Sequence, residues 1–221
     1  GSSFGISIKF EVQSKPEGIA QAFLIGESFI DGDPVALVLG DNLFHGDELV
    51  SKIMYASKNI DGATIFGYPV SDPERYGVIE LDSNRKVVSI EEKPQRPKSR
   101  YAITGLYFFD PSVVEKARKV FPSSRGELEI TDVHRMYLSE GLLDVELLGR
   151  GMTWLDTGTV DSLNDANSYI RTLENRQGLK VGCPEEVAWR KGWIDSKKMR
   201  TLAERLCDSG YGNYLLQLLE S

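Results

Sequence analysis

Short apolar runs alternate with amphipathic stretches along most of this 221-residue chain. Apolar and polar residues alternate in residues 6–12, as in a strand with one buried face, while the unbroken apolar run at 35–39 is typical of a strand buried on both faces. The same patterns predict further strands at 63–70, 76–82, 86–94, 101–110 and, as two short pieces, within 145–156. Residues 83–85 are expected to close a hairpin.

Between these runs, apolar residues recur three or four positions apart, which is the spacing of a helix face. Helices are predicted around 19–30, around 47–59, from Pro111, after the acidic run that follows Arg125, at 160–177, from Pro184 and from Asp195 or Ser196. The alternation predicts an α/β fold with a Rossmann-like, mostly parallel mixed sheet flanked by helices. Residues 1–160 are expected to form the α/β domain, and 161–221 a helical appendage packed on it.

Composition narrows the class of protein. The formal net charge of −7 argues against general nucleic-acid binding, which needs clustered Lys and Arg. No apolar run approaches the roughly 20 residues that span a bilayer, and the first residues do not read as a signal peptide. Cys183 and Cys207 lie far apart in the sequence. They are therefore expected to be unpaired thiols without a functional role, as in a reducing cytoplasm. A cytoplasmic protein without nucleic-acid or membrane partners is therefore expected.

Two aspartates follow predicted strands at their ends. Asp41 follows the run at 35–39, and Asp156 ends the short run in TWLDTG. Open α/β sheets bind ligands at strand ends, and Mg²⁺ takes one or two carboxylates together with substrate phosphates and waters. The two residues are thus candidate Mg²⁺ ligands. Each aspartate could equally cap the turn or helix that follows it, and both interpretations stay open.

Three other short motifs carry candidate chemistry. In SIEEKP, Lys93 could hold a phosphate and Glu92 could accept hydrogen bonds from sugar hydroxyls, although a surface ion pair at a hairpin end would look the same. Gly77, directly after Tyr76, would let a ligand approach the backbone or would mark a bulge. Arg125 could reach a phosphate or lie in solvent at a helix start. No P-loop, dinucleotide-binding fingerprint, nucleophile elbow or histidine metal spacing occurs.

Seven motifs occur together and in a fixed order: QSKPEGIAQAF, LVLGDN, ERYGV, EEKP, ITGLYFFD, RGELEITD and TWLDTG. In this combination the chain resembles the glucose-1-phosphate thymidylyltransferases, a family of sugar-nucleotide NTP transferases. The resemblance covers essentially all 221 residues, including the helical tail QGLKVGCPEEVAWRKGWI. It implies attack by glucose 1-phosphate on the α-phosphorus of dTTP, with release of pyrophosphate and formation of dTDP-glucose for dTDP-rhamnose and cell-surface polysaccharide synthesis.

The resemblance also assigns residue roles. Asp41 and Asp156 would bind Mg²⁺, the implied cofactor, and Asp41 would thereby contact the nucleotide, whose thymine would be bound by Gln13 and Gly18. The sugar phosphate would be held by Lys93, a catalytic residue together with the two aspartates. The remaining residues expected to line the sugar site are Tyr76, Gly77, Glu92, Ile103, Arg125 and Trp154.

The family pattern begins with a strand and a glycine-rich loop, G-G-x-G-T-R-L, followed by a Lys, and nothing in residues 1–12 matches it. The chain is therefore expected to be an N-terminally truncated piece that is inactive or poorly folded alone. The family also implies a homotetramer with a regulatory nucleotide site, for which Glu186 and Arg190 are the candidates. Open alternatives are a UTP-using uridylyltransferase, a non-catalytic regulatory relative, and a metal-dependent glycosyltransferase, which would normally show Asp-x-Asp where this chain has Gly40-Asp41-Asn42.

Overall fold

The computed structural model describes residues 1–58 and 60–220. The chain forms two compact units, residues 11–163 and residues 1–10 together with 164–221. It passes from the larger unit to the smaller within helix α6 (Val160–Gln177). The expected boundary at residue 160 lies close to this division, whereas residues 1–10, expected in the α/β domain, belong to the helical unit.

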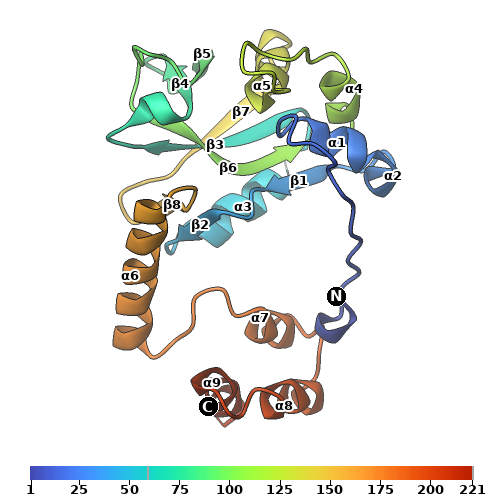
Figure 1. Cartoon of the computed structure of the whole chain (residues 1–221), viewed down its shortest axis with the longest axis vertical. Coiled ribbons are helices and arrows are strands. Elements are labelled where there is room, and N and C mark those ends of the chain that lie inside the picture. Colours follow the sequence, from blue (N-terminus) through green and yellow to red (C-terminus); the bar gives the residue numbers. More distant parts are fainter. Residues whose placement is uncertain (59, 221) are drawn as a thin grey trace. The chain divides into compact units, whose positions relative to one another are not determined.

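The smaller unit is helical and has its own core. It contains the short 3₁₀ helix η1 (Ser2–Phe4), most of α6, and helices α7 (Pro184–Arg190), α8 (Ser196–Glu204) and α9 (Gly210–Leu218) (Figure 1). Asp195 caps α8 by accepting a hydrogen bond from the Lys198 backbone N–H at 2.7 Å, as predicted. Helix α9 was not predicted, because its glycine-rich start has low helix propensity; burial of Leu215 against α8 residues such as Met199 and Ala203 stabilises it.

The predicted strand at 6–12 is absent. Residues 6–12 have no regular secondary structure and join no β-ladder among the described residues. Phe10 and Val12, expected on a buried face, are 88% and 82% exposed. Alternation predicts which face of a strand is apolar, but a strand forms only where a neighbour takes up its backbone hydrogen bonds.

The larger unit is built on a six-stranded mixed sheet. Its strands are β1 (Val35–Val38), β3 (Ala63–Pro69), β4 (Gly77–Leu81), β5 (Val87–Glu92), β6 (Tyr101–Phe109) and β7 (Leu143–Leu147), in the order β5-β4-β6-β3-β7 with β1 also paired to β6. Only the β3–β7 pair is parallel in this sheet, so the mixed α/β sheet is confirmed but the expected predominance of parallel pairing is wrong. Strand β6 runs antiparallel to all three of the described strands with which it pairs, β1, β3 and β4.

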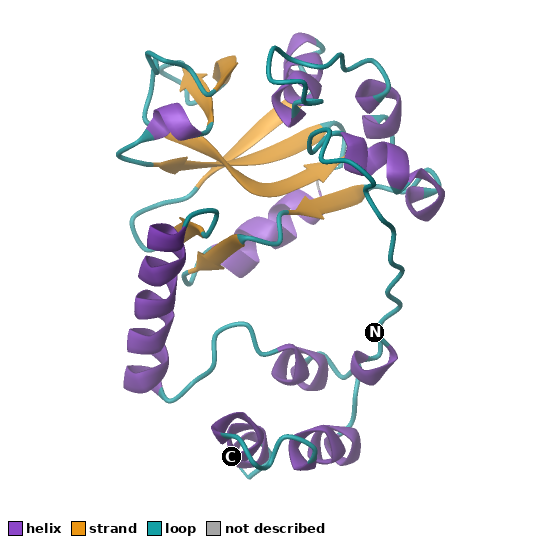
Figure 2. Ribbon diagram, viewed as in Figure 1, coloured by secondary structure: helices purple, strands orange, loops and turns teal. Residues whose placement is uncertain are grey.

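Helices flank the sheet on both faces (Figure 2). Along β6, Tyr107 and Phe109 join the core formed with α1 (Gln21–Ile25), α2 (Glu27–Ile30), α4 (Val113–Ala117) and α5 (Ile130–Ser139). Leu106 and Phe108 point to the opposite core, which contains Ala56 of α3 (Leu49–Lys58). Because successive side chains of a strand point to opposite faces of the sheet, β6 contributes residues to both cores.

Several predictions fail in detail. Strand β1 is not buried on both faces as expected: alternate residues are exposed, and Val38 is 57% exposed. The helix expected around 19–30 is divided at Gly26 into α1 and α2. An unpredicted strand, β2 (Asn42–His45), pairs antiparallel with β8 (Thr153–Asp156) in a separate two-stranded sheet.

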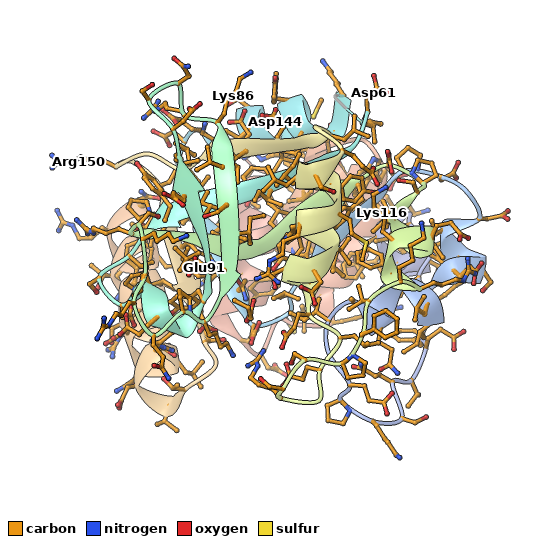
Figure 3. All side chains as sticks on the ribbon, turned by 90° about the horizontal axis from the view of Figure 1, so that it is seen from above. Asp61, Lys86, Glu91, Lys116, Asp144 and Arg150 are labelled. Carbon is orange, nitrogen blue, oxygen red and sulfur yellow. The ribbon has the colours of Figure 1, made fainter. Side chains whose placement is uncertain are left out.

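The β4–β5 hairpin is confirmed. Asp82 Oδ1 accepts hydrogen bonds from the Asn84 and Lys86 backbone N–H groups at 2.8 and 2.9 Å, which fixes the turn. Lys86 itself is exposed there, as are Asp61, which comes shortly before β3, and Asp144 in β7 (Figure 3). No helix in the described part of the chain is long and apolar enough to cross a bilayer.

Strand β6 is shared between two neighbours on one of its edges. Its residues 106–109 pair with β1, and its residues 101–102 pair with β4. The end of β1 and the start of β4 therefore converge on residues 103–105. This interruption in the ladder is where the candidate site lies.

Candidate active site

A cavity of about 500 Å³ opens at the interruption beside β6. The ends of β1, β5 and β8 and the start of β4 contribute side chains to it, as does the segment leading into α5. Of the residues predicted for the site, the cavity is lined by Asp41, Tyr76, Gly77, Glu92, Lys93, Ile103, Arg125, Trp154 and Asp156. Nine residues from distant motifs thus meet at one place, within the larger unit.

The β2–β8 ladder brings the two aspartates to the cavity. Asn42 pairs with Asp156 in the register, so that Asp41 comes directly before the residue opposite Asp156. Thr157 strengthens this connection by donating both its backbone N–H and its hydroxyl to the Asp41 backbone oxygen, each at 2.9 Å. Asp156 also accepts the Gly158 N–H through Oδ1 at 3.0 Å, which is the turn-capping role considered from the sequence, while its Oδ2 lies 3.5 Å from Arg75 Nη2.

The donor set at this point fits a magnesium ion shared with a substrate. Asp41 and Asp156 line the cavity with two carboxylates, and the described residues contain no group of three or more His, Cys, Asp and Glu able to hold a metal. A closed protein site would need more ligands, whereas Mg²⁺ bound with nucleotide phosphates needs only one or two carboxylates. The two aspartates are therefore the residues that would hold the ion.

One wall of the cavity is packed closely around Gly77. A Cβ at Gly77 would lie 2.8 Å from Thr131 Cγ2 and 3.4 Å from Glu92 Oε2, so no side chain fits there. The Tyr76 and Trp154 rings meet edge to face, 5.0 Å apart, beside it. Burial, reinforced by the negative charge of Glu129, raises the pKa of the Glu92 carboxyl.

Two cations face this wall. Lys93 has a positive φ of 42° and donates its backbone N–H to the Tyr76 oxygen at 3.0 Å, which fixes the sharp bend after β5. Arg125 Nη2 lies 2.8 Å from Glu129 Oε2, 3.1 Å from Glu127 Oε2 and 3.4 Å from Glu92 Oε1. With Arg75, which also lines the cavity, they are cations that could offset the charge of a bound phosphate.

Gln13 and Gly18, predicted to bind the base, lie beside each other but not among the residues that line this cavity. Gln13 Nε2 donates to the Gly18 oxygen at 3.2 Å. Gly18 has φ of 106°, and a Cβ there would lie 2.4 Å from the Leu128 oxygen, so the position requires glycine. The next residue, Ile19, does line the cavity.

The predicted regulatory residues, Glu186 and Arg190, lie in the helical unit. They form an ion pair within α7, with Arg190 Nε 2.7 Å from Glu186 Oε1. The Tyr214 hydroxyl donates to the other carboxylate oxygen of Glu186. Arg190 remains 59% exposed.

Sequence reasoning missed several lining residues, among them Asn42, Arg75, Glu129 and Thr131. Asn42 and Arg75 stand next to predicted residues in LGDN and ERYGV, and the other two lie in RGELEITD. Their motifs were recognised, but only the pairing of β2 with β8 and the docking of α5 show that these side chains reach the cavity.

Comparison with known proteins identifies the family of this chain. A family model described as nucleotidyl transferase matches residues 1–172. The chain is 54% identical over 220 residues to the glucose-1-phosphate thymidylyltransferase of Neisseria meningitidis serogroup A, and equally to that of Mycolicibacterium smegmatis; each match covers 100% of this chain and 76% of the relative. This chain belongs to the nucleotidyl transferase family, and the resemblance to glucose-1-phosphate thymidylyltransferases is confirmed.

Solved structures support the fold assignment. A Bacillus anthracis crystal structure in complex with a sucrose matches with a TM-score of 0.71 and 39% identity, covering 83% of this chain and 70% of that one. UDP-glucose pyrophosphorylase complexed with UDP-glucose matches with a TM-score of 0.63 and 22% identity, over 72% of this chain and 65% of that one. The chain therefore has the α/β fold of nucleotidyltransferases and is an enzyme of that class.

Proposed function

We propose that this site transfers a thymidylyl group from dTTP to glucose 1-phosphate in a Mg²⁺-dependent reaction, giving dTDP-glucose and pyrophosphate. The observation that carries the proposal is the meeting of Asp41, Asp156, Glu92, Lys93 and Arg125 around one cavity. Relatives 54% identical over the whole chain bear the name of this activity. The product would serve dTDP-rhamnose and surface polysaccharide synthesis.

The chemistry requires positioning and charge neutralisation. An oxygen of the sugar phosphate attacks the α-phosphorus of dTTP, a P–O bond forms, and the bond to pyrophosphate breaks on the opposite side. Mg²⁺ held by Asp41 and Asp156 would offset the charge of the nucleotide phosphates. Lys93, with Arg125, binds the sugar phosphate so that its oxygen faces the nucleotide.

The sugar and the base are recognised by different groups. Glu92 accepts hydrogen bonds from sugar hydroxyls, Ile103 contributes its backbone, and Trp154 with Tyr76 forms the wall beside Gly77, where the ring approaches closely. The thymine is assigned to Gln13 and Gly18. Since these two lie outside the lining of the cavity, the choice between dTTP and UTP is the least constrained part of the proposal. Tighter binding of UDP-glucose than dTDP-glucose would favour the uridylyltransferase alternative.

Three further expectations accompany the proposal. A homotetramer in the cytoplasm, with Glu186 and Arg190 at a regulatory site, stays a prediction. If light scattering shows that this chain is a monomer, the expected homotetramer is contradicted for this chain.

Calorimetric titration of the 221-residue chain with glucose 1-phosphate tests the sugar-phosphate site. Lys93→Ala should weaken binding roughly tenfold or more, because a charge-assisted contact is lost. Lys86→Ala, in the exposed hairpin turn, is the matched control and should bind like the parent chain. Equal affinity of all three chains would overturn the assignment of Lys93.

A further inference from the structure

The side-chain amide of Asn42 connects three parts of the site. Its Oδ1 accepts a hydrogen bond from the Gly105 backbone N–H at 3.0 Å and another from Trp154 Nε1 at 2.6 Å. Its Nδ2 donates to Asp41 Oδ1 at 2.8 Å. Strand β6, the wall of the sugar pocket and a candidate metal ligand thus meet at one amide.

The chemistry of these partners fixes the orientation of the amide. A backbone N–H and an indole N–H can only donate, so the amide oxygen must face Gly105 and Trp154. Reversing the amide would place its NH₂ group against two donors and its oxygen against the Asp41 carboxylate. The amide nitrogen therefore faces Asp41 and donates its hydrogen bond to that carboxylate.

Gly105 makes room for this arrangement. A Cβ on Gly105 would lie 2.6 Å from Asn42 Oδ1 and 2.7 Å from its Cγ, so any larger residue would displace the amide. Asp41 itself is exposed, and an exposed carboxylate rotates unless something holds it. The bond from Asn42 restricts one of its oxygens and leaves Oδ2 without a hydrogen bond from the described residues.

We propose that Asn42 is a positioning residue that holds the Asp41 carboxylate ready for a divalent cation and couples its orientation to Trp154. The inference rests on the proposed metal-binding role of Asp41. It adds that the metal end and the sugar end of the cavity are linked through one amide. Displacing the indole then weakens cation binding, although Trp154 is not a cation ligand.

The affinity of the 221-residue chain for Mn²⁺ at a fixed dTTP concentration, measured by electron paramagnetic resonance of the free ion and corrected for Mn²⁺ bound to free nucleotide, tests the coupling. Asn42→Ala should raise the Kd for Mn²⁺ about tenfold, the usual range for losing a residue that orients a ligand. Trp154→Phe, which keeps an aromatic wall but removes the Nε1–H donor, should raise it about threefold. In the Asn42→Ala background, Trp154→Phe should have no further effect.

A purely structural role predicts a different pattern. Folded variants would then bind Mn²⁺ like the parent chain, or the two substitutions would have additive effects, and either result overturns the inference. Asn84→Ala in the hairpin turn is the control and should leave the Kd unchanged. If Asn42→Ala does not fold, an unchanged Kd in Trp154→Phe suffices to overturn it. A parent chain that binds no Mn²⁺ refutes the metal site itself and is thus distinguishable.

Discussion

Glu129 holds Arg125 through both of its carboxylate oxygens, with Nη2 2.8 Å from Oε2 and Nε 3.1 Å from Oε1. The Glu129 side chain is 8% exposed and also accepts the Ser123 hydroxyl at 2.7 Å. Glu92 and Glu127 approach the same Nη2 from more exposed positions. A bound phosphate would therefore compete with these two while Glu129 keeps the guanidinium in place.

The Arg125–Glu129 geometry predicts that Arg125→Lys is not a conservative change. A Lys keeps the charge but cannot occupy both Glu129 oxygens and a phosphate at once, and we expect about tenfold weaker binding of glucose 1-phosphate. Titration calorimetry measures this. Arg85→Lys in the hairpin turn is the control, and equal affinities for all three chains would show that Arg125 does not bind the sugar phosphate.

Glu92 links sugar binding to pH. Because burial and Glu129 raise its pKa above the ordinary 4.5, the ionised acceptor is lost at a higher pH than for an exposed Glu. Glucose 1-phosphate affinity should thus fall as the pH drops towards this raised pKa, and Glu92→Gln should remove that dependence with about tenfold weaker binding at pH 7. An unchanged midpoint in the variant would assign the titration to another group.

The raised pKa of Glu92 also makes the stability of the fold depend on pH, in the opposite direction from sugar-phosphate binding. Between the unfolded and the raised folded pKa, the folded chain binds more protons than the unfolded one, so ionised Glu92 lowers the free energy of unfolding as pH rises. Glu92→Gln is therefore expected to be no less stable than the parent at pH 7 in urea denaturation. Together the two results would separate a binding role from a structural one.

A substitution at Gly77 tests how closely Thr131 packs against this position in the cavity wall. Gly77→Ala would place its Cβ 2.8 Å from Thr131 Cγ2, and the overlap should lower the free energy of unfolding by about 1–3 kcal/mol and weaken sugar-phosphate binding. Thr131→Ser removes that methyl group, so the double variant should recover stability. Gly210→Ala, where nothing lies within 4 Å, is the control. No recovery in urea denaturation of the double variant would contradict the clash.

His134 predicts an acid-sensitive core. It is fully buried against Phe109, neither ring nitrogen has a hydrogen-bond partner in the described structure, and burial lowers its pKa to about 3. The unfolded chain therefore binds one more proton between about pH 3 and pH 6.5, and stability is lost as the pH falls through this window.

His134→Leu should flatten the dependence of the free energy of unfolding on pH between pH 5 and 6.5, where most carboxylates stay ionised. Urea denaturation at several pH values measures the slope. The parent slope should be larger by close to one proton near pH 5 and by about half a proton at pH 6.5. Identical slopes in parent and variant would show that His134 is already protonated or exposed.

The success of prediction from sequence differed between elements for physical reasons. The β4–β5 hairpin and α8 were predictable because local signals, a turn at 83–85 and a cap at Asp195, specify them. The segment 6–12 and the pairing direction of β6 were not, because both depend on which neighbours take up backbone hydrogen bonds. Strand β2 follows β1 so closely that its residues read as a loop.

The candidate site shows the same division. Asp41, Glu92, Lys93 and Asp156 could be singled out because carboxylates and cations at strand ends suggest ligand binding. Asn42 could not, since its importance lies in bonds to residues 63 and 112 positions away. Only the folded chain brings those partners together.

The central claim is that Asp41 and Asp156 share one divalent cation. Crystals of the chain grown with Mn²⁺ and dTTP, measured for anomalous scattering, test it most directly. We expect one peak at about 2.0–2.3 Å from an oxygen of each carboxylate, with nucleotide phosphate completing the coordination. A cation bound to only one of the two aspartates, or a nucleotide bound with neither, would contradict it.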